Sequence, residues 1–290
     1  VRRSFQRSLR KNLLRLAENS SVPLIRDRLR DSDVIYSSAP TEIVEDLICH
    51  GLGIVAIDRV VELSTDHDPE LISKLLLERD ERIGQQRTFG VRIKRLGKKG
   101  EWDSQSYACA LGAALIEQDP SLVVDLSNPE WWVKIILEPS RVSLIEKRIQ
   151  GPGGLPAGAQ GDVLAQLQTK EDAMSSFLIM RRGSRVIPIM DSKPEFIELL
   201  LKWDPFLGVR SRTKYEAEQM FQRPAWGVVG LTIEQAKPHV QRREGAIKTT
   251  PLSTLEPLCG WNDSEKTAQW KHLNDPRHYL AHPDTTSWFE

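Results

Sequence analysis

The residues Gly151-Pro-Gly-Gly-Leu-Pro-Ala-Gly-Ala-Gln-Gly161 mark the clearest change of composition in this chain of 290 residues. Neither a helix nor a strand is expected here, because proline lacks a backbone donor and glycine loses much conformational freedom on folding. The segment also lacks the Lys and Ser or Thr of a Walker loop, which disfavours a phosphate-binding role. We expect an irregular connector that packs against the part of the chain that follows it.

After this segment, short strands and helices alternate. Apolar runs at 163–167 and 186–190 predict strands, and the patterns at 171–182 and 194–203 predict helices. Such alternation predicts a parallel sheet with right-handed crossovers. Beyond Trp203 the pattern weakens, although part of it continues in the segments 215–221, 226–230, 233–237 and 263–273.

Before the segment, the pattern indicates α+β structure. An amphipathic helix opens the chain, and its basic residues are Arg2, Arg3, Arg7, Arg10, Lys11 and Arg15. Strands are expected at 22–26 and 34–37, followed by a helix at 41–50 with Thr41 as its cap and by a strand at 54–61. These elements suggest a small α+β sandwich. A second set follows, with helices at 69–82 and from a Ser104 cap onward, and with strands at 88–95, 123–126, 131–137 and 142–147.

Several motifs, in this order and spacing, resemble the tRNA 4-thiouridine sulfurtransferases (ThiI). They are Arg2-Arg-Ser-Phe-Gln-Arg-Ser-Leu9, Phe89-Gly-Val-Arg-Ile-Lys-Arg95, Val124-Asp-Leu-Ser-Asn-Pro129 and the glycine-rich segment 151–161. The resemblance is strong over residues 1–183. It is fainter beyond, where Val228-Val-Gly230 and the segment 250–260 resemble later strands of the family's last domain.

The resemblance implies a domain order. A ferredoxin-like domain is expected at 1–62, a THUMP RNA-binding domain at 63–150, a linker at 151–161 and a degenerate PP-loop domain, of the adenine nucleotide alpha hydrolase-like α/β class, at 162–290. Family members begin with a strand before the first helix, and that strand is missing before Val1. Three explanations stay open: a trimmed chain, a misassigned start, or an incomplete N-terminal sheet.

The family's catalytic motifs are altered in this chain. The family places Ser-Gly-Gly-x-Asp-Ser after the first strand of the last domain, where backbone amides hold the phosphates of ATP. Here the same place reads Gln168-Thr169-Lys170-Glu171-Asp172, and side chains replace both glycines. Glu171 or Asp172 corresponds to the motif's aspartate. The family's sulfur-carrying cysteine has no counterpart between Pro188 and Pro257. We therefore expect no catalytic residue and no cofactor, with ATP bound only if the chain is a divergent enzyme.

A basic cluster at the end of the 88–95 strand is the main RNA-binding candidate, and it comprises Arg92, Lys94, Arg95, Lys98 and Lys99. Charge runs are usually solvated surface, but the nearest acid is Glu101, and a phosphate backbone suits a localised positive field. Resemblance to THUMP domains favours RNA for this cluster and for the basic face of the first helix. Strand alternation also points one of Trp131 and Trp132 outward, which makes that indole a candidate for base stacking.

Composition excludes several other classes. The 40 basic and 40 acidic residues give zero net charge, so binding to nucleic acid or membrane by overall charge is excluded. No apolar run is long enough for a membrane helix, and no signal peptide is recognisable, so a cytoplasmic protein is expected. Cys49, Cys109 and Cys259 form no CxxC motif and are expected to be buried thiols. No metal is expected at His272, His278, His282 and Cys259, because Pro276 and Pro283 interrupt any helical ligand spacing.

These observations predict a tRNA-binding protein that grips the acceptor-stem end of tRNA and whose PP-loop domain has lost catalysis. We expect a homodimer, or a heteromer with an active sulfurtransferase. Its interface would be anchored by some of the aromatic residues Trp203, Phe206, Trp226, Trp261 and Trp270. Two alternatives are a divergent ATP-dependent enzyme that makes 4-thiouridine and a structural subunit without RNA contact.

Overall fold

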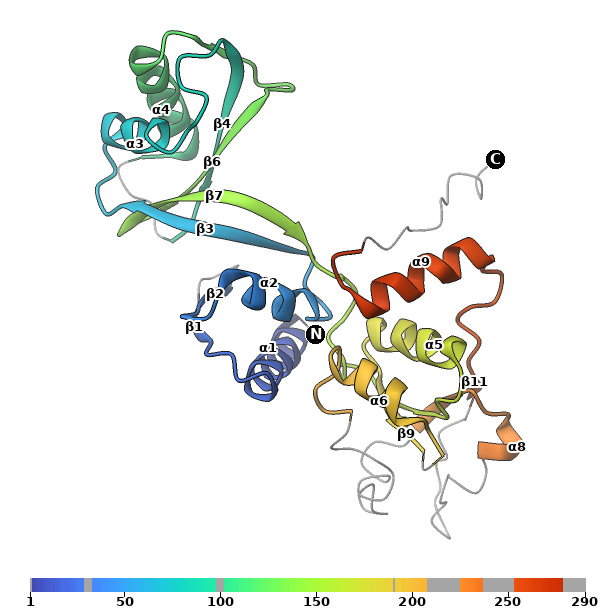
Figure 1. Ribbon diagram of the computed structural model, residues 1–290. Helices are drawn as coiled ribbons and strands as arrows, with labels where there is room; N and C mark the ends of the chain where they lie inside the picture. The colour runs from blue at the N-terminus through green and yellow to red at the C-terminus, as the bar shows by residue number, and fades with distance from the viewer. Residues whose placement is uncertain are drawn as a thin grey trace. The chain divides into compact units, whose positions relative to one another are not determined.

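The computed structural model describes residues 2–28, 33–97, 102–189, 191–207, 225–236 and 253–278 (Figure 1). The chain divides into two compact units. The first unit combines Val1–Ile25, Ser37–Ile57 and Gln150–Glu290, and the second combines Arg26–Tyr36 with Asp58–Ile149. The domain boundaries inferred from the family resemblance stay a prediction.

The second unit is built on a five-stranded mixed sheet. Its strand order is β3 (Ala56–Ser64), β7 (Arg141–Gln150), β6 (Trp131–Glu138), β4 (Arg87–Arg95) and β5 (Leu122–Val124). Strand β4 runs parallel to β5 and β6, and β6 pairs with β7 in antiparallel fashion. The strands β1 (Ile25–Arg28) and β2 (Asp33–Tyr36) form a separate two-stranded sheet.

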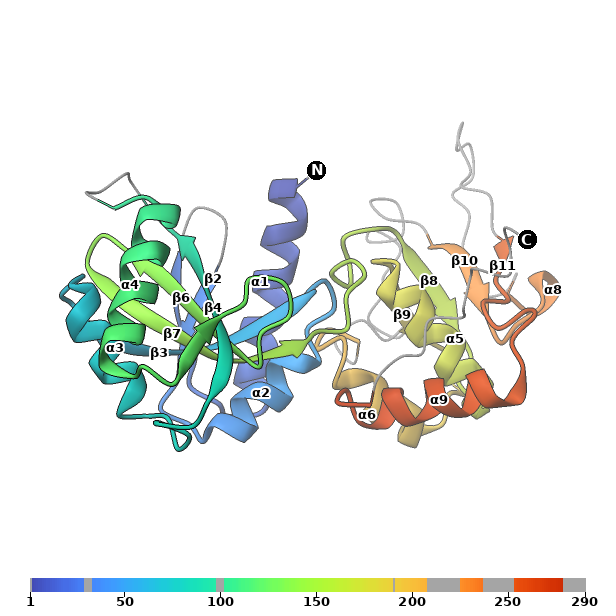
Figure 2. The same cartoon turned by 90° about the horizontal axis from the view of Figure 1, so that it is seen from above.

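Two helices cover one face of the five-stranded sheet. Helices α3 (Pro69–Leu77) and α4 (Ser104–Gln118) pack on each other, and α4 packs on β4 (Figure 2). Alternation sends Phe89, Val133 and Ile135 toward these helices, where they are buried with Tyr107 and Leu111 of α4. The even-numbered residues of β4 and β6 therefore lie on the opposite face.

Four boundaries illustrate where the structure differs from the sequence-based expectation. Asp103, not Ser104, caps α4, because its carboxylate accepts the amides of Gln105 and Ser106 at 2.8 Å each. Thr41 is the first residue of α2 (Thr41–Cys49) rather than its cap, and Pro40 at the cap position makes no side-chain capping hydrogen bond. Helix α3 ends at Leu77 instead of 82, where Asp80 starts a turn by accepting the Arg82 amide at 3.1 Å. The first short strand starts at Ile25 rather than 22.

The first unit contains the predicted parallel sheet, which is confirmed. Its order is β11 (Ser253–Thr254), β10 (Ala225–Val229), β8 (Asp162–Ala165) and β9 (Arg185–Pro188), and all pairs are parallel. Every residue of β8 and β9 is buried, as expected for a parallel sheet that is covered on both faces. Among the described residues of this unit, the helices are α1 (Arg2–Asn19), α2, α5 (Lys170–Arg181), α6 (Pro194–Leu201), α8 (Ile233–Ala236) and α9 (Asp263–Asn274). The segment 215–221 lies outside the described residues.

The glycine-rich segment 151–161 contains no helix or strand and packs against the turn between α5 and β9, as expected of the connector. The amides of Leu155 and Gln160 donate to the carbonyls of Arg181 and Gly183, at 2.8 Å each. Gly154 has a φ of +74°, and a Cβ there would lie 2.4 Å from the Arg181 carbonyl oxygen. Only glycine allows this backbone approach.

A buried ion pair joins this segment to the rest of the first unit. Arg185 Nε donates to Asp204 Oδ2 at 2.7 Å, and the two side chains are 7% and 0% exposed. Arg185 Nη2 also donates to the Ala157 carbonyl at 3.2 Å, and Asn12 Nδ2 of α1 donates to that same carbonyl at 2.9 Å. One guanidinium therefore links β9, the connector and the chain after α6, and the shared Ala157 carbonyl adds α1.

We predict that Asp204→Asn lowers the free energy of unfolding by about 3–5 kcal/mol, because it leaves the buried Arg185 charge uncompensated. Urea unfolding followed by circular dichroism measures the loss. Glu18→Gln is the control, since its pair with Arg15 is exposed and is worth at most about 1 kcal/mol. A loss in Asp204→Asn no larger than in the control would contradict the assigned role of the buried pair.

Two buried histidines flank Trp203 in the core of the first unit. Ring centroids lie 4.8 Å apart for His50 and Trp203 and 5.3 Å apart for His272 and Trp203. Each Nδ1 lies within hydrogen-bond distance of a backbone carbonyl, that of Asp46 at 2.8 Å and that of His278 at 2.5 Å. Each Nε2 is buried without a partner among the described residues. Burial lowers the pKa of both imidazoles, so the fold favours their neutral form.

We predict that the first unit loses stability below pH 6.5, the ordinary pKa of histidine. Below this pH the two imidazoles bind protons in the unfolded chain but not in the folded chain. The stability that the neutral histidines contribute is therefore complete above pH 6.5, and it is lost as the pH falls toward their lowered pKa in the folded state. The slope is at most about 1.4 kcal/mol per pH unit for each histidine. Urea unfolding of the native protein and of His272→Leu at pH 7.5 and 5.5 tests this, and an equal pH dependence in the two would refute it.

Candidate nucleic-acid interface

The strand pairing of the second unit gathers positive charge on the sheet face opposite α3 and α4. Arg92 and Lys94 of β4 are exposed there. The parallel register sets Arg92 opposite Lys134 of β6. We call Arg92, Lys94 and Lys134 the basic strand face. The sequence pattern did not indicate Lys134 as part of this cluster, because it is 42 residues from Arg92 and becomes its neighbour only through strand pairing.

The other predicted members of the basic cluster are placed differently. Arg95 is odd-numbered and lies on the face of β4 that carries Ile93, by alternation. It is partly buried, and its Nη1 has no hydrogen-bond partner among the described residues. Lys98 and Lys99 lie outside the described residues. The structure thus brings Arg92 and Lys94 together with Lys134, and does not bring Arg95 to that face.

Asp58 is an acidic neighbour of the basic strand face. Arg148 of β7 donates to both of its carboxylate oxygens, at 2.7 and 2.8 Å. These hydrogen bonds are the main reason that the pKa of Asp58 lies below its usual value, and the charges of Lys94 and Lys134 lower that pKa further. Arg148 therefore binds the carboxylate whose pKa the charges of Lys94 and Lys134 also lower.

The two adjacent tryptophans point to opposite faces, as alternation predicts. Trp131 packs against the core with its ring 6.4 Å from that of Phe89. Trp132 lies on the side of the basic strand face, where the Arg92 guanidinium carbon is 3.7 Å from its ring centroid. Of the two, Trp132 is therefore the candidate for contact with a ligand.

The basic residues of α1 belong to the first unit and form a separate surface. Arg2, Arg3, Arg7 and Lys11 are exposed, and Arg10 is partly buried. The Lys11 ammonium lies 4.8 Å from the ring centroid of Phe206. Arg15 pairs with Glu18 at 3.1 Å.

The segment 168–172, where the altered nucleotide loop is predicted, is closed by its own aspartate. Thr169 caps α5, and Asp172 three residues later completes a capping box. The amides of Gln168 and Thr169 donate to Asp172 Oδ2 at 3.1 and 2.9 Å. Lys170 extends to the ring of Trp270, 5.2 Å from its centroid, and Glu171 is exposed. Backbone donors that a phosphate would use are thus taken by a carboxylate of the chain.

The backbone of Gly230 lies close to Asp172 at the start of α5. Its φ is +69°, and a Cβ there would lie 2.5 Å from the Gln166 carbonyl oxygen and 2.9 Å from Asp172 Oδ1. The end of β10 therefore lies against the aspartate.

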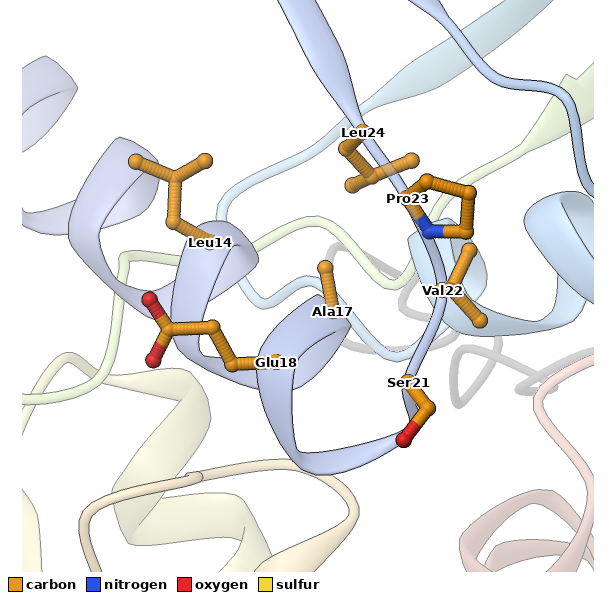
Figure 3. A pocket seen from close by; sticks show the side chains of 7 residues that line it. All are labelled: Leu14, Ala17, Glu18, Ser21, Val22, Pro23 and Leu24. Atoms are coloured by element: carbon orange, nitrogen blue, oxygen red, sulfur yellow. The ribbon is translucent and has the colours of Figure 1, made fainter.

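A hollow of about 390 Å³ lies between the end of α1 and the residues after it (Figure 3). Its lining is mostly apolar, and it consists of Leu14, Ala17, Glu18, Ser21, Val22, Pro23 and Leu24. No predicted site residue lines it.

The three cysteines differ in exposure. Cys49 is buried, and burial raises the pKa of its thiol to about 11. Cys109 and Cys259 are exposed, which corrects the expectation that all three are buried. Within the described ranges, no group of three His, Cys, Asp or Glu could hold a metal ion, and no helix is long and apolar enough to cross a membrane.

Comparison with known proteins shows likeness to one class of enzymes. No protein-family model matches the chain. It is 34% identical over 144 residues to the tRNA sulfurtransferase of Citrobacter koseri, which covers 49% of this chain and 30% of that protein. It is 34% identical over 176 residues to the tRNA sulfurtransferase of Edwardsiella ictaluri, with coverage of 58% and 36%. The chain thus spans about a third of the length of these curated relatives.

Solved structures share the fold. PH1313 from Pyrococcus horikoshii superposes with a TM-score of 0.67 at 20% identity, covering 94% of each chain. A 4-thiouridine synthetase crystallised with RNA and bound ATP superposes with a TM-score of 0.63 at 17% identity, covering 94% of this chain and 80% of that one. The fold is therefore the predicted one, α+β ferredoxin-like and THUMP parts followed by a parallel α/β PP-loop-like domain. More particularly, the resemblance to tRNA sulfurtransferases is confirmed.

Proposed function

We propose that the chain binds tRNA through the basic strand face, Arg92, Lys94 and Lys134. The observation that carries this proposal is the strand register, which gathers three basic residues on one face of the sheet, beside an acid that Arg148 binds. A localised positive surface suits the phosphate backbone of RNA even in a chain of zero net charge. The shared fold with a synthetase crystallised with RNA supports the same assignment. The exposed arginines of α1 supply a second surface, and the acceptor-stem end is the part of tRNA we propose is bound.

We further propose that this chain does not adenylate its RNA and acts as a binding or scaffold subunit in tRNA modification. Asp172 holds the amides of Gln168 and Thr169, and ATP would have to displace that carboxylate. The chain also has no cysteine between Pro188 and Pro257 to carry sulfur. A cytoplasmic location agrees with this role.

The rival proposal is a divergent sulfurtransferase that makes 4-thiouridine. It is supported by the 34% identity to proteins named tRNA sulfurtransferase. The two proposals differ at one place, the segment Gln168–Asp172, because the enzyme must bind ATP there and the scaffold need not.

Assembly is a further part of the proposal. We propose a homodimer, in preference to a heteromer with an active sulfurtransferase, because a two-fold interface needs only one kind of chain. Trp203 does not serve as an anchor, since it is 1% exposed and lies in the core. Phe206, Trp226, Trp261 and Trp270 are only partly buried. Light scattering in the micromolar range that gives the 32.9 kDa monomer, with no partner recovered from lysate, would refute both assemblies.

We predict that replacing Arg92, Lys94 and Lys134 together by Ala weakens binding to tRNA and flattens its salt dependence. Each lost phosphate contact removes about one unit from the slope of log K against log salt. Fluorescence anisotropy at several salt concentrations measures both quantities. Lys74→Ala is the control, because Lys74 is an exposed lysine on α3, on the covered face of the sheet. Equal slopes for the triple variant and the native protein would remove the basic strand face from the interface.

We predict that calorimetry detects no binding of ATP with magnesium at millimolar nucleotide. The variant Asp172→Ala tests the role of the carboxylate, because it frees the amides of Gln168 and Thr169. Glu171→Ala, at an exposed position, is the matched control. Neither is expected to form 4-thiouridine in tRNA, because the sulfur-carrying cysteine is absent. Micromolar ATP affinity in the native protein, or 4-thiouridine formed by it, would favour the enzyme instead.

A further inference from the structure

Arg181, the last residue of α5, carries a partly buried positive charge without a carboxylate partner among the described residues. Burial lowers the pKa of its guanidinium, the charge of Arg182 lowers that pKa further, and no carboxylate raises it. Arg185 is buried too, but Asp204 binds it at 2.7 Å. Because removing a cation from water without a counter-ion costs free energy, the unpaired guanidinium of Arg181 requires a physical explanation.

The connector holds this guanidinium in one orientation. Arg181 Nε donates to the Pro152 carbonyl at 3.0 Å. The backbone of Arg181 is held as well, since its carbonyl accepts the Leu155 amide at 2.8 Å. With Nε engaged, the Nη1 and Nη2 atoms remain as a pair of donors at the far end of the planar group.

The far end of the guanidinium is open to a ligand. Nη1 and Nη2 of Arg181 have no hydrogen-bond or ion-pair partner in the part of the chain that the structure describes, and neither atom is fully buried. Gly153 has a φ of +63°, and a Cβ there would lie 3.7 Å from Nη2. A longer side chain at that position would start in contact with Nη2, and a positive φ disfavours one. The glycine therefore leaves the donor pair uncovered.

Arg182 adds a second positive charge at the same place. It is the C-cap residue of α5, it is exposed, and its side chain has no partner within the described ranges. Because its charge lowers the pKa of Arg181, the two guanidinium groups act on a common region. The dipole of α5 favours a cation at this end of the helix. That effect requires neither an oriented guanidinium nor an uncovered pair of donors.

We propose that Arg181 and Arg182 form a phosphate-binding site at the end of α5, with Nη1 and Nη2 of Arg181 as a bidentate donor. The planar fork of arginine matches two oxygens of a phosphate, and the hydrogen bond from Nε to Pro152 orients the fork in advance. The phosphate belongs either to an RNA backbone or to a small phosphorylated molecule. The site lies in the first unit and the basic strand face in the second, so this inference goes beyond the proposed function and does not depend on it.

The test uses the full chain and inorganic phosphate in a buffer without other phosphate at pH 7.5. Broadening of the phosphorus NMR line on addition of protein measures binding, and we expect it to saturate. Arg181→Lys keeps the charge but loses the fork, and it is expected to weaken binding about tenfold. Arg182→Ala is expected to weaken it about threefold. Lys74→Ala removes an exposed charge from the other unit and should leave phosphate binding unchanged.

A folding measurement accompanies each variant. Arg182 is exposed, so the urea midpoint of Arg182→Ala should equal that of the native protein, and unfolding then cannot explain its weaker binding. Absence of saturable binding in the native protein, or equal binding in the native protein, Arg181→Lys and Arg182→Ala, would overturn the site.

Saturating tRNA distinguishes the two sources of phosphate. Displacement of inorganic phosphate by tRNA would support the site and identify an RNA backbone as its ligand, whereas simultaneous binding of both would support a small phosphorylated molecule. A native protein that binds inorganic phosphate but no tRNA would refute the proposed function and leave the phosphate site standing.

Discussion

The first unit depends on one buried charge. Arg185 sits at the start of β9, and its guanidinium binds Asp204 after α6 and the Ala157 carbonyl of the connector, with Asn12 of α1 on that same carbonyl. These groups come from four stretches separated by as many as 192 positions in the sequence. Loss of the partner of a buried arginine leaves an uncompensated charge, which is strongly destabilising. The folded arrangement of each stretch therefore depends on the presence of the others. The glycines at 154 and 158 serve this constraint, since their lack of side chains lets the connector approach Arg181 and Arg185.

The second unit is organised differently, by alternation along paired strands. One face of the sheet packs against α3 and α4, and β4 contributes Phe89 to the core that they enclose. The same strand contributes Arg92 and Lys94 to the other face, so a single nine-residue strand supplies both stability and charge. Because period-two alternation fixes the face of every side chain, a shift of one residue in β4 would bury the basic residues and expose Phe89. The register of β4 with β6 is thus also the register of the proposed interface.

Sequence patterns predicted the elements well wherever one local rule decided them. The parallel sheet followed from strand–helix alternation, and the opposite directions of Trp131 and Trp132 followed from strand periodicity. Helix starts were missed by one residue at Asp103 and Pro40. At α4 two adjacent polar residues, Asp103 and Ser104, compete for the cap, and at α2 the cap position is held by Pro40, which makes no side-chain capping hydrogen bond. Lys134, the Asp58–Arg148 pair and the Arg185–Asp204 pair depend on contacts between distant segments, which no local pattern encodes. The hydrogen bonds that Asp172 accepts from the amides of Gln168 and Thr169 likewise depend on backbone geometry that the sequence pattern does not encode.

The capping box at the start of α5 stabilises that helix terminus without a ligand. A glycine loop that waits for a phosphate leaves its amides unsatisfied until the ligand arrives, and the protein is less stable in the meantime. With Thr169 and Asp172 in place, the same amides are satisfied permanently within one polypeptide, where the competing group is covalently tethered and never diluted away. The terminus therefore contributes the same stability whether or not a ligand is present. A substitution that removed the Asp172 carboxylate would lower stability before any ligand could compensate for the loss.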